Sequence, residues 1–234
     1  MELTFASYNI HKAVGLDRRR DPDRILAVLR EIDADVVALQ EADRRMGRRE
    51  SVLPLASIAE HSPYRAVALN HRPHSLGWHG NALLVRRGFK VAEAGIVPLP
   101  TLEPRGAIRA DLLVEGRRLR VVGMHLDLSG LRRRQQVRAI LAHVAACGHP
   151  CPAVLMGDLN EWATRGGSLR EFHAPWRLLA PGRSFPSRQP VAQFDRIALS
   201  PEWHLLGAGV HHSPLAARAS DHLPVWARIE LPKI

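Results

Sequence analysis

Short runs of apolar residues recur along the chain, and most have the length of a β-strand. Period and length separate strands from helices, because a buried strand spans about four to eight residues. The runs that predict strands are residues 3–9, 35–41, 82–85, 108–114, 119–125, 153–158, 196–199 and 223–231. Glu115-Gly116-Arg117 separates two of these runs and predicts a hairpin.

Three other segments carry apolar residues at helical spacing. In the first, Asp21 is expected to cap the helix and Pro22 to occupy its first position. The apolar residues within 25–32 would then share one buried face. Residues 52–60 and 131–146 predict two further helices.

The order of these elements fits neither a repeated strand–helix–strand pattern nor an all-β fold. Hairpins alternate with strands that are linked through helices. Two mixed sheets packed face to face, with helices on the outside, accommodate this order. We therefore expect an α/β (α+β) fold, a four-layer sandwich, formed by a single domain over residues 1–234.

Length and composition support a single globular domain. The chain has 234 residues, of which 46% are hydrophobic. No apolar run reaches the length of a membrane span, and the first residues lack the regions of a signal peptide. Cys147 and Cys151 have no second pair with which to form a zinc site. We expect a cytoplasmic protein with two reduced thiols.

The chain is strongly basic, with a net charge of +10 from 33 Lys+Arg against 23 Asp+Glu. Such a charge favours polyanionic partners, namely nucleic acid, anionic lipid head groups or phosphorylated small molecules, without choosing between them. Nearly all of the positive charge is arginine, which suits phosphate well. A GC-rich genome explains the arginine content equally well, so both explanations stay open.

Polar residues gather at the ends of the predicted strands, where a rigid scaffold can hold a site. They are Asn9, Glu41, His125, Asp127, Asp158, Asn160, Asp221 and His222, and Asp195 begins a strand instead. A single acid at such a position is usually a solvated loop residue, but this many together indicate one site. Oxygen ligands such as Glu41 and Asp221 suit Mg²⁺ or Mn²⁺. Zinc is disfavoured, because no histidine pair on a helix and no cysteine cluster appear.

Together these segments resemble the endonuclease/exonuclease/phosphatase superfamily. The matching segments are Ser7-Tyr8-Asn9-Ile10, Leu39-Gln40-Glu41, Gly80-Asn81-Ala82-Leu83-Leu84, Gly123-Met124-His125-Leu126-Asp127, Met156-Gly157-Asp158-Leu159-Asn160, Phe194-Asp195-Arg196-Ile197 and Ser220-Asp221-His222-Leu223-Pro224. Each motif is weak alone, but they run in the family's order over almost the whole chain. The resemblance implies a deoxyribonuclease I-like fold and a metal-dependent phosphoesterase.

The resemblance also implies a role for each matching position. The metal ligands would be Asn9, Glu41 and Asp221, and the catalytic residues would be His125, Asp158, Asn160, Asp195 and His222. Asp195 would fix the tautomer of His222, and charged His222 would stabilise the phosphorane. Asp158 and Asn160 would orient or deprotonate the attacking water. Family members differ on whether aspartate or histidine is the base, so this choice stays open.

Substrate contacts are expected at Asn81, Arg105, Phe185 and Arg188. For Arg105, an edge position in the hairpin is an equally good explanation. Residues 132–134 are three arginines at a helix start, where a phosphate contact is conceivable but a solvated charge run is favoured. The basic and aromatic loop at residues 71–79 could stack a base, but Trp78 is rather expected to cap the core.

Three functions fit this sequence. The first is a monomeric Mg²⁺- or Mn²⁺-dependent phosphodiester hydrolase that uses metal-activated water to cut DNA or RNA, without a covalent intermediate. The second is a phosphodiesterase or phosphatase acting on a phospholipid head group or a phosphorylated small molecule. The third is a non-catalytic binding module that kept the fold, which the intact set of acids and histidines disfavours. The basic charge and the resemblance place the nuclease first.

Overall fold

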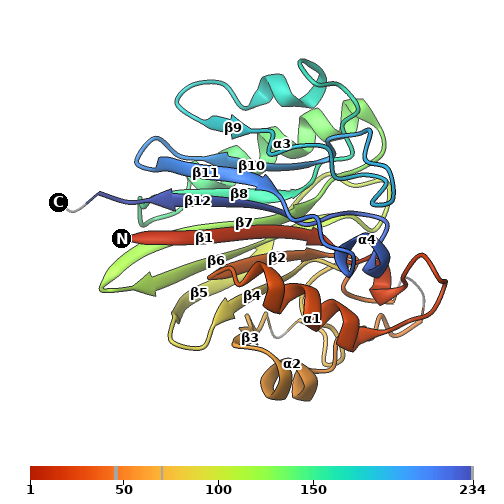
Figure 1. Ribbon diagram of the computed structural model, residues 1–234. Helices are drawn as coiled ribbons and strands as arrows, with labels where there is room; N and C mark the ends of the chain where they lie inside the picture. Colours follow the sequence, from red (N-terminus) through yellow and green to blue (C-terminus); the bar gives the residue numbers. More distant parts are fainter. Residues whose placement is uncertain (45–46, 70, 233–234) are drawn as a thin grey trace.

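The computed structural model describes residues 1–44, 47–69 and 71–232, and within them the chain forms two six-stranded sheets (Figure 1). The first sheet has the order β11 (His204–Val210), β12 (Val225–Glu230), β1 (Glu2–Asn9), β2 (Val36–Gln40), β4 (Ala82–Arg86) and β3 (Tyr64–Ala66). The second has the order β5 (Lys90–Val97), β6 (Gly106–Val114), β7 (Arg117–His125), β8 (Ala153–Asp158), β10 (Asp195–Leu199) and β9 (Arg177–Leu179). Each sheet is mixed, because β1 pairs with β2 and β7 with β8 in parallel, whereas the remaining pairs are antiparallel.

The largest apolar cluster lies between the two sheets. Phe5 and Val36 from the first sheet and Val121 and Met156 from the second belong to it, and all four are fully buried. At Gly123 a Cβ atom would lie 3.2 Å from the Ala38 Cβ atom of the facing sheet. The two sheets therefore pack closely enough here to favour a residue without a side chain.

Helices cover the outer faces of both sheets. They are α1 (Pro22–Ile32), α2 (Leu55–His61), α3 (Gly130–Ala145) and the short α4 (Ala216–Ala219), with 3₁₀ turns η1 (His11–Ala13) and η2 (Gly167–Glu171). Two further apolar clusters join α1 and α2 to the first sheet, and α3 and η2 to the second. The order of layers is thus helix, sheet, sheet, helix.

The predicted four-layer sandwich and its central strands are confirmed. Asp21 caps α1 as expected, since its side chain accepts a hydrogen bond of 3.0 Å from the backbone N–H of Arg24. The second helix begins at Leu55 rather than at residue 52. Pro54 lies in an extended conformation directly before it, as its N-cap, so the helix begins three residues later than the apolar pattern suggested.

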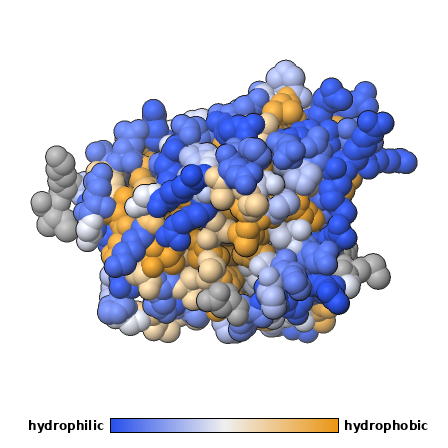
Figure 2. All heavy atoms as spheres, turned by 90° about the horizontal axis from the view of Figure 1, so that it is seen from below, coloured by the Kyte–Doolittle hydropathy of each residue, from blue (hydrophilic) through white to orange (hydrophobic). Residues whose placement is uncertain are grey.

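The edge at which β1, β2, β7 and β8 end brings the motif residues together. β1 runs parallel to β2, and β7 parallel to β8, so each pair ends on the same side. In Figure 1 the N-terminus, where β1 begins, lies at the opposite side from the point where β1 ends. Seen from below (Figure 2), hydrophobic residues form a band across the middle, and the end toward which β1 runs is largely hydrophilic.

Candidate active site

The second sheet places three motif positions, His125, Asp158 and Asp195, in one transverse row, with Gly106 at its end. Strand register sets Gly106 opposite His125, His125 opposite Asp158, and Asp158 opposite Asp195. β10 is antiparallel to β8, so the residue that begins β10 lies where β8 ends. This pairing explains why Asp195 precedes its strand while the other acids follow theirs.

The first sheet contributes Asn9 and Glu41 from neighbouring strands. Asn9 ends β1 and lies opposite Gln40, the last residue of β2. Glu41 follows with a φ of +54°, a left-handed conformation that is uncommon for residues other than glycine. Gly80 lies directly against it, since a Cβ atom there would be 3.3 Å from the Glu41 Cα atom. Backbone strain at a functional residue is often tolerated because the surroundings fix it.

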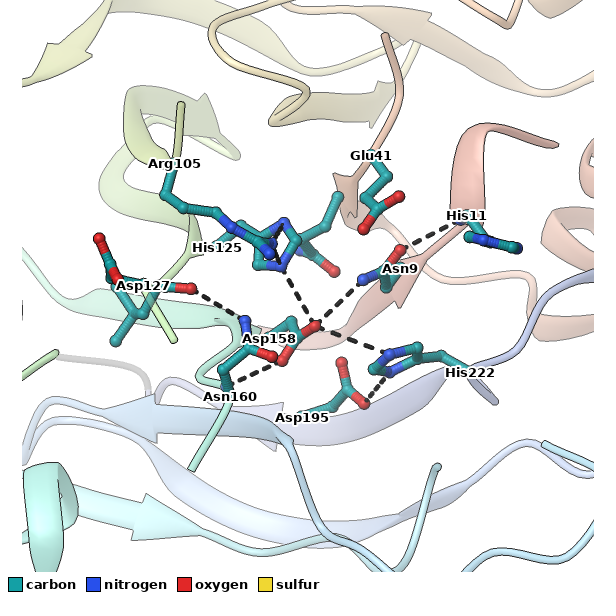
Figure 3. A network of polar contacts seen from close by, with 12 residues as sticks. Asn9, His11, Glu41, Arg105, His125, Asp127, Asp158, Asn160, Asp195 and His222 are labelled. Atoms are coloured by element: carbon teal, nitrogen blue, oxygen red, sulfur yellow. Dashed lines mark hydrogen bonds and ion pairs between the residues drawn. The ribbon is translucent and has the colours of Figure 1, made fainter. Parts of the chain in front are cut away.

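Asp158 is the centre of the network in Figure 3, where side chains from both sheets meet. Its Oδ2 atom accepts a hydrogen bond of 3.0 Å from the Asn9 amide. The same oxygen lies 3.3 Å from Nε2 of His125 and 3.7 Å from Nε2 of His222. Its Oδ1 atom accepts from the backbone N–H of Asn160 at 2.9 Å. The carboxylate is therefore held from four directions.

His222 is oriented by a buried carboxylate behind it. Its Nδ1 atom lies 2.9 Å from Oδ2 of Asp195, which directs Nε2 toward Asp158. The hydroxyl of Ser184 donates to the same Asp195 oxygen at 2.5 Å. This carboxylate–imidazole pair is the arrangement that fixes a histidine tautomer.

Electrostatics keeps Asp158 ionised. Burial alone would raise the pKa of Asp158, but His222 and His125 outweigh it and hold that pKa well below its usual range. Burial alone would lower the pKa of His222, but the carboxylates of Asp195 and Asp158 raise it to about 10. Burial raises the pKa of Asp195, and His222 opposes that shift. Asp158 and His222 therefore stabilise each other in their charged forms, and Asp195 faces His222 from the other side.

Glu41 lies in a cleft next to this cluster, and the cleft is rich in cations. Its lining residues are Lys12, Glu41, Asp43, Arg44, Arg49, His79, Gly80, Pro104, Arg105 and His125. The ammonium group of Lys12 contacts the Glu41 carboxylate. The backbone N–H of Lys12 also donates a hydrogen bond of 3.1 Å to the Glu41 backbone carbonyl. Burial would raise the pKa of Glu41, but His125, Lys12 and Arg105 outweigh it and lower the pKa.

Two groups of side chains could hold a metal ion. In the first, ligand atoms of Asp158, Asp195 and His222 lie within 4.8 Å of one another, and all three residues are buried. A hard ion such as Mg²⁺ usually keeps several waters, and the His222 Nδ1 atom already faces Asp195, so this group fits a hydrogen-bond relay better. The second group is Glu41, which lines the cleft, with Asn9 beside it, whose amide oxygen accepts from the backbone N–H of His11 at 3.1 Å. Its chemistry fits a hard divalent ion.

The remaining predicted metal and catalytic residues lie around this centre. Asp221 is half-buried, and its Oδ1 atom is 3.9 Å from Nδ1 of His11, which follows Asn9 closely. The side-chain amide of Asn160 donates to the Leu126 carbonyl at 2.9 Å. That contact anchors Asn160 to the end of β7, next to His125.

The four residues predicted to contact the substrate differ in their distance from the site and in their exposure to solvent. Arg105 lines the cleft and its guanidinium contacts the His125 ring, so it belongs to the site. Phe185 packs on the His222 ring, with centroids 4.8 Å apart. Asn81 is fully buried and donates to the Trp78 carbonyl, a position that supports the adjacent turn. Arg188 is exposed on the loop that follows Phe185.

Sequence reasoning missed two residues of this network. Lys12 contacts Glu41, and it stands only three residues after Asn9, which was the available signal. Ser184 holds Asp195 and directly precedes Phe185. Lys12 and Glu41 are 29 positions apart, and Ser184 and Asp195 are 11 apart, so the period of a single strand or helix does not reveal either contact.

Arg133, within the arginine run at residues 132–134, and Trp78 both lie against buried parts of the protein. The favoured solvated charge run at residues 132–134 is wrong for Arg133, which is buried and forms an ion pair of 3.3 Å with Glu161. A buried carboxylate opposite this helix turn explains why the cation is tolerated there. Trp78 packs on the core between the sheets, as expected.

The chain is similar in sequence and in fold to one family of known proteins. A sequence profile described as the Endonuclease/Exonuclease/phosphatase family matches residues 6–222. No curated protein matches the sequence. Among the described residues, none of the helices combines the length and hydrophobicity that a bilayer crossing requires.

Solved structures with the same fold include three of particular interest. An endonuclease/exonuclease/phosphatase from Bacteroides vulgatus is 16% identical, with a TM-score of 0.78 over 99% of this chain and 100% of that one. The D. rerio TDP2 complexed with a single-strand DNA product is 18% identical, with a TM-score of 0.73 over 98% and 99%. The Bacteroides thetaiotaomicron mannosyl-6-phosphatase Bt3783 is 21% identical, with a TM-score of 0.76 over 97% and 99%.

Proposed function

Because the chain belongs to the endonuclease/exonuclease/phosphatase family, we propose that it is a divalent-metal-dependent phosphodiester hydrolase that acts on nucleic acid. The family consists of hydrolytic phosphoesterases, so the chain is an enzyme rather than a non-catalytic binding module.

One observation carries the proposal. A single carboxylate oxygen of Asp158 faces the Asn9 amide and the imidazoles of His125 and His222. These four residues come from four different strands or loops. An ionised carboxylate surrounded by donors can orient a water molecule and accept its proton. The donors can then stabilise the negative charge that develops on a phosphoryl group.

The opposite charges of Asp158 and His222 suggest different roles for these two residues. The lowered pKa of Asp158 keeps its carboxylate ionised, so that it can accept a hydrogen bond from the attacking water, and we propose it as the proton acceptor because of its position among the donors. The raised pKa of His222 keeps its imidazole charged at neutral pH, which suits stabilisation of a phosphorane or protonation of a leaving oxygen. Asp195 acts through His222 by fixing its orientation.

Glu41 and Asn9 would hold the metal ion, and Asp221 would complete the set. Mg²⁺ or Mn²⁺ bound there supplies charge neutralisation for the phosphate oxygens. Lys12 and Arg105 line the same cleft and provide further positive charge toward the substrate. Phosphoryl transfer to water depends mainly on such positioning and neutralisation.

The cationic cleft favours nucleic acid as the substrate. Lys12, Arg44, Arg49 and Arg105 line it together. A row of cations suits a substrate with several phosphates, and the chain carries a net charge of +10. The structural neighbour D. rerio TDP2, with its single-strand DNA product, supports this choice.

A phosphomonoesterase or a hydrolase of phospholipid head groups is the second candidate. The concave shape of the cationic cleft could also accept a terminal phosphate group. The structural likeness to a mannosyl-6-phosphatase supports this alternative.

A substrate panel tests the proposal. Single-stranded DNA, plasmid DNA, RNA, an aryl phosphodiester, an aryl phosphomonoester and phosphatidylglycerol vesicles would each be incubated with Mg²⁺ or Mn²⁺. We expect cleavage of the nucleic acids and of the aryl diester, and complete loss with EDTA. Hydrolysis of the monoester alone would overturn the nuclease proposal in favour of a phosphatase, and hydrolysis of the lipid alone in favour of a phospholipase.

A further inference from the structure

Trp162 presents a large aromatic side chain to solvent only two residues after Asn160. Its exposed fraction is 68%, although tryptophan is highly buried on average. None of the functions assigned above uses this ring. A rigid exposed ring next to a catalytic centre is a candidate binding surface.

A continuous row of rings joins Trp162 to the catalytic histidine. The Trp162 ring meets Phe194 edge-on, with centroids 4.7 Å apart. Phe194 stacks on Phe185 at 5.1 Å, and Phe185 lies 4.8 Å from the ring of His222. The exposed ring is therefore fixed relative to the imidazole that acts on the phosphate.

The backbone around Trp162 is held in place from both sides. Asn160 is anchored to the Leu126 carbonyl. The buried carboxylate of Glu161 accepts hydrogen bonds from the backbone N–H groups of Ala163 and Ser168, at 3.2 and 3.0 Å. The guanidinium of Arg133 adds an ion pair of 3.3 Å with the same carboxylate.

Gly167 makes this anchoring possible. Its φ is +53°, and a Cβ atom at this position would lie 2.4 Å from Oε2 of Glu161. A side chain there would displace the carboxylate that holds the loop. The chain thus fixes the backbone of Trp162 tightly and still leaves the side chain in solvent, which lowers the entropic cost of a later contact.

We propose that Trp162 stacks on a nucleobase of the substrate next to the phosphate that is cut. The proposal rests on the proposed nuclease function. Base–aromatic stacking is tolerant of sequence because every base has a flat face, and it suits single strands. Trp162 would thereby favour an unpaired nucleotide beside the cleavage point over a bare sugar–phosphate backbone.

Two substrates with the same backbone test this proposal. One is a tetramer of thymidine, and the other is a tetramer of abasic residues with identical phosphates. We expect Trp162→Ala to lower kcat/KM for the thymidine tetramer about tenfold or more. The abasic tetramer should respond less than about twofold, because its charge contacts are unchanged. Trp162→Phe should retain most of the activity on thymidine.

Leu131→Ala is the matched control. Leu131 is also 68% exposed, but it lies on α3 and outside the row of rings. This variant should leave kcat/KM unchanged for both tetramers. Binding of fluorescently labelled tetramers, measured by anisotropy in EDTA, should show the same difference between thymidine and abasic chains without any turnover.

Each other outcome contradicts the proposal in a distinct way. Equal losses on both tetramers would make Trp162 a structural residue, and no loss on either would remove it from the site. Weaker binding to phosphatidylglycerol vesicles, with unchanged cleavage of thymidine, would assign the ring to a membrane surface instead. If the wild-type enzyme cleaves neither tetramer but hydrolyses methyl 4-nitrophenyl phosphate, the nuclease function itself fails, and base stacking fails with it.

Discussion

At the scale of single residues, the function of each side chain depends on a partner that is distant in sequence. Asp195 orients His222 from 27 positions away, and Ser184 holds Asp195 from a third segment. The Oδ1 atom of Asp195 has no hydrogen-bond partner within the described residues. The Ser184 hydroxyl therefore carries much of the positioning of this carboxylate.

Removing that hydroxyl should weaken catalysis without weakening substrate binding. A hydrogen bond to a charged group contributes about 1.5–3 kcal/mol, so Ser184→Ala should lower kcat about tenfold or more and leave KM nearly unchanged. Steady-state kinetics on an aryl phosphodiester measures both constants. Ser213→Ala is the control, because that hydroxyl contacts Glu31 instead. A rise in KM at unchanged kcat would argue against a positioning role.

The candidate site could be predicted from the sequence as a set of positions, but its contacts could not. Asn9, Glu41 and Asp158 each follow an apolar run, and this local signal survives in a single sequence. The ion pair of Lys12 with Glu41 depends on how β1 and β2 end side by side. Only strand register brings such residues together, and register is a property of the folded sheets.

At the scale of elements, the predicted strands and the missed strands differ in their place in the sheets. The missed strands are β3, β5, β9 and β11, which are the four edge strands of the two sheets as described. Bulges break the alternation in β5 and β11, and β3 and β9 have only three residues each. Edge strands need no continuous apolar pattern, because one side faces no partner strand.

The pair β6 and β7 contains a buried ion pair whose loss should be costly. Asp111 lies opposite Arg120 in the register, and both of its oxygens accept from that guanidinium at 2.8 Å. Asp111→Asn keeps the volume but leaves a buried arginine without its counter-charge. We expect a loss of about 3 kcal/mol in the free energy of unfolding, measured by urea denaturation. Glu2→Gln, which alters an exposed acid paired with the exposed Arg228, should change it by less than about 0.5 kcal/mol.

The loss of unfolding free energy in Asp111→Asn should depend on pH. Burial would raise the pKa of Asp111, but Arg120 and Arg109 outweigh it and lower the pKa below that of the unfolded chain. A lowered pKa stabilises the fold above the unfolded value and loses this contribution as the pH falls. The difference between wild type and Asp111→Asn should therefore be full near pH 7 and shrink below about pH 4. A difference that grows on acidification would contradict this ion pair.

At the scale of the whole molecule, positive charge and a preformed cleft act together. The net charge of +10 attracts polyanions over a distance, and the cleft beside Glu41 concentrates four lysine and arginine side chains near the buried cluster of Asp158 and His222. The layered fold was predictable because it follows from apolar runs. The cleft was not, because loops far apart in the sequence form its walls.

Binding to single-stranded DNA in EDTA should weaken steeply with salt. The logarithm of the binding constant should fall linearly with the logarithm of the salt concentration, with a slope near −0.7 for each phosphate contacted. Arg105→Ala should reduce the size of this slope by about one contact. Arg228→Ala removes an exposed arginine that pairs with Glu2, and it should leave the slope unchanged. Equal slopes for wild type and Arg105→Ala would place the DNA elsewhere on the protein.

The measurement that tests the account most directly is the Mn²⁺-dependent rate of diester hydrolysis by wild type, Asp158→Asn and His222→Ala. Each variant removes one member of the buried cluster, so kcat should fall at least a hundredfold in both, with folding checked by circular dichroism. Asp23→Asn, an exposed change on α1, should retain full activity. Folded Asp158→Asn and His222→Ala proteins that keep the wild-type rate would show that the chemistry takes place somewhere other than this cluster.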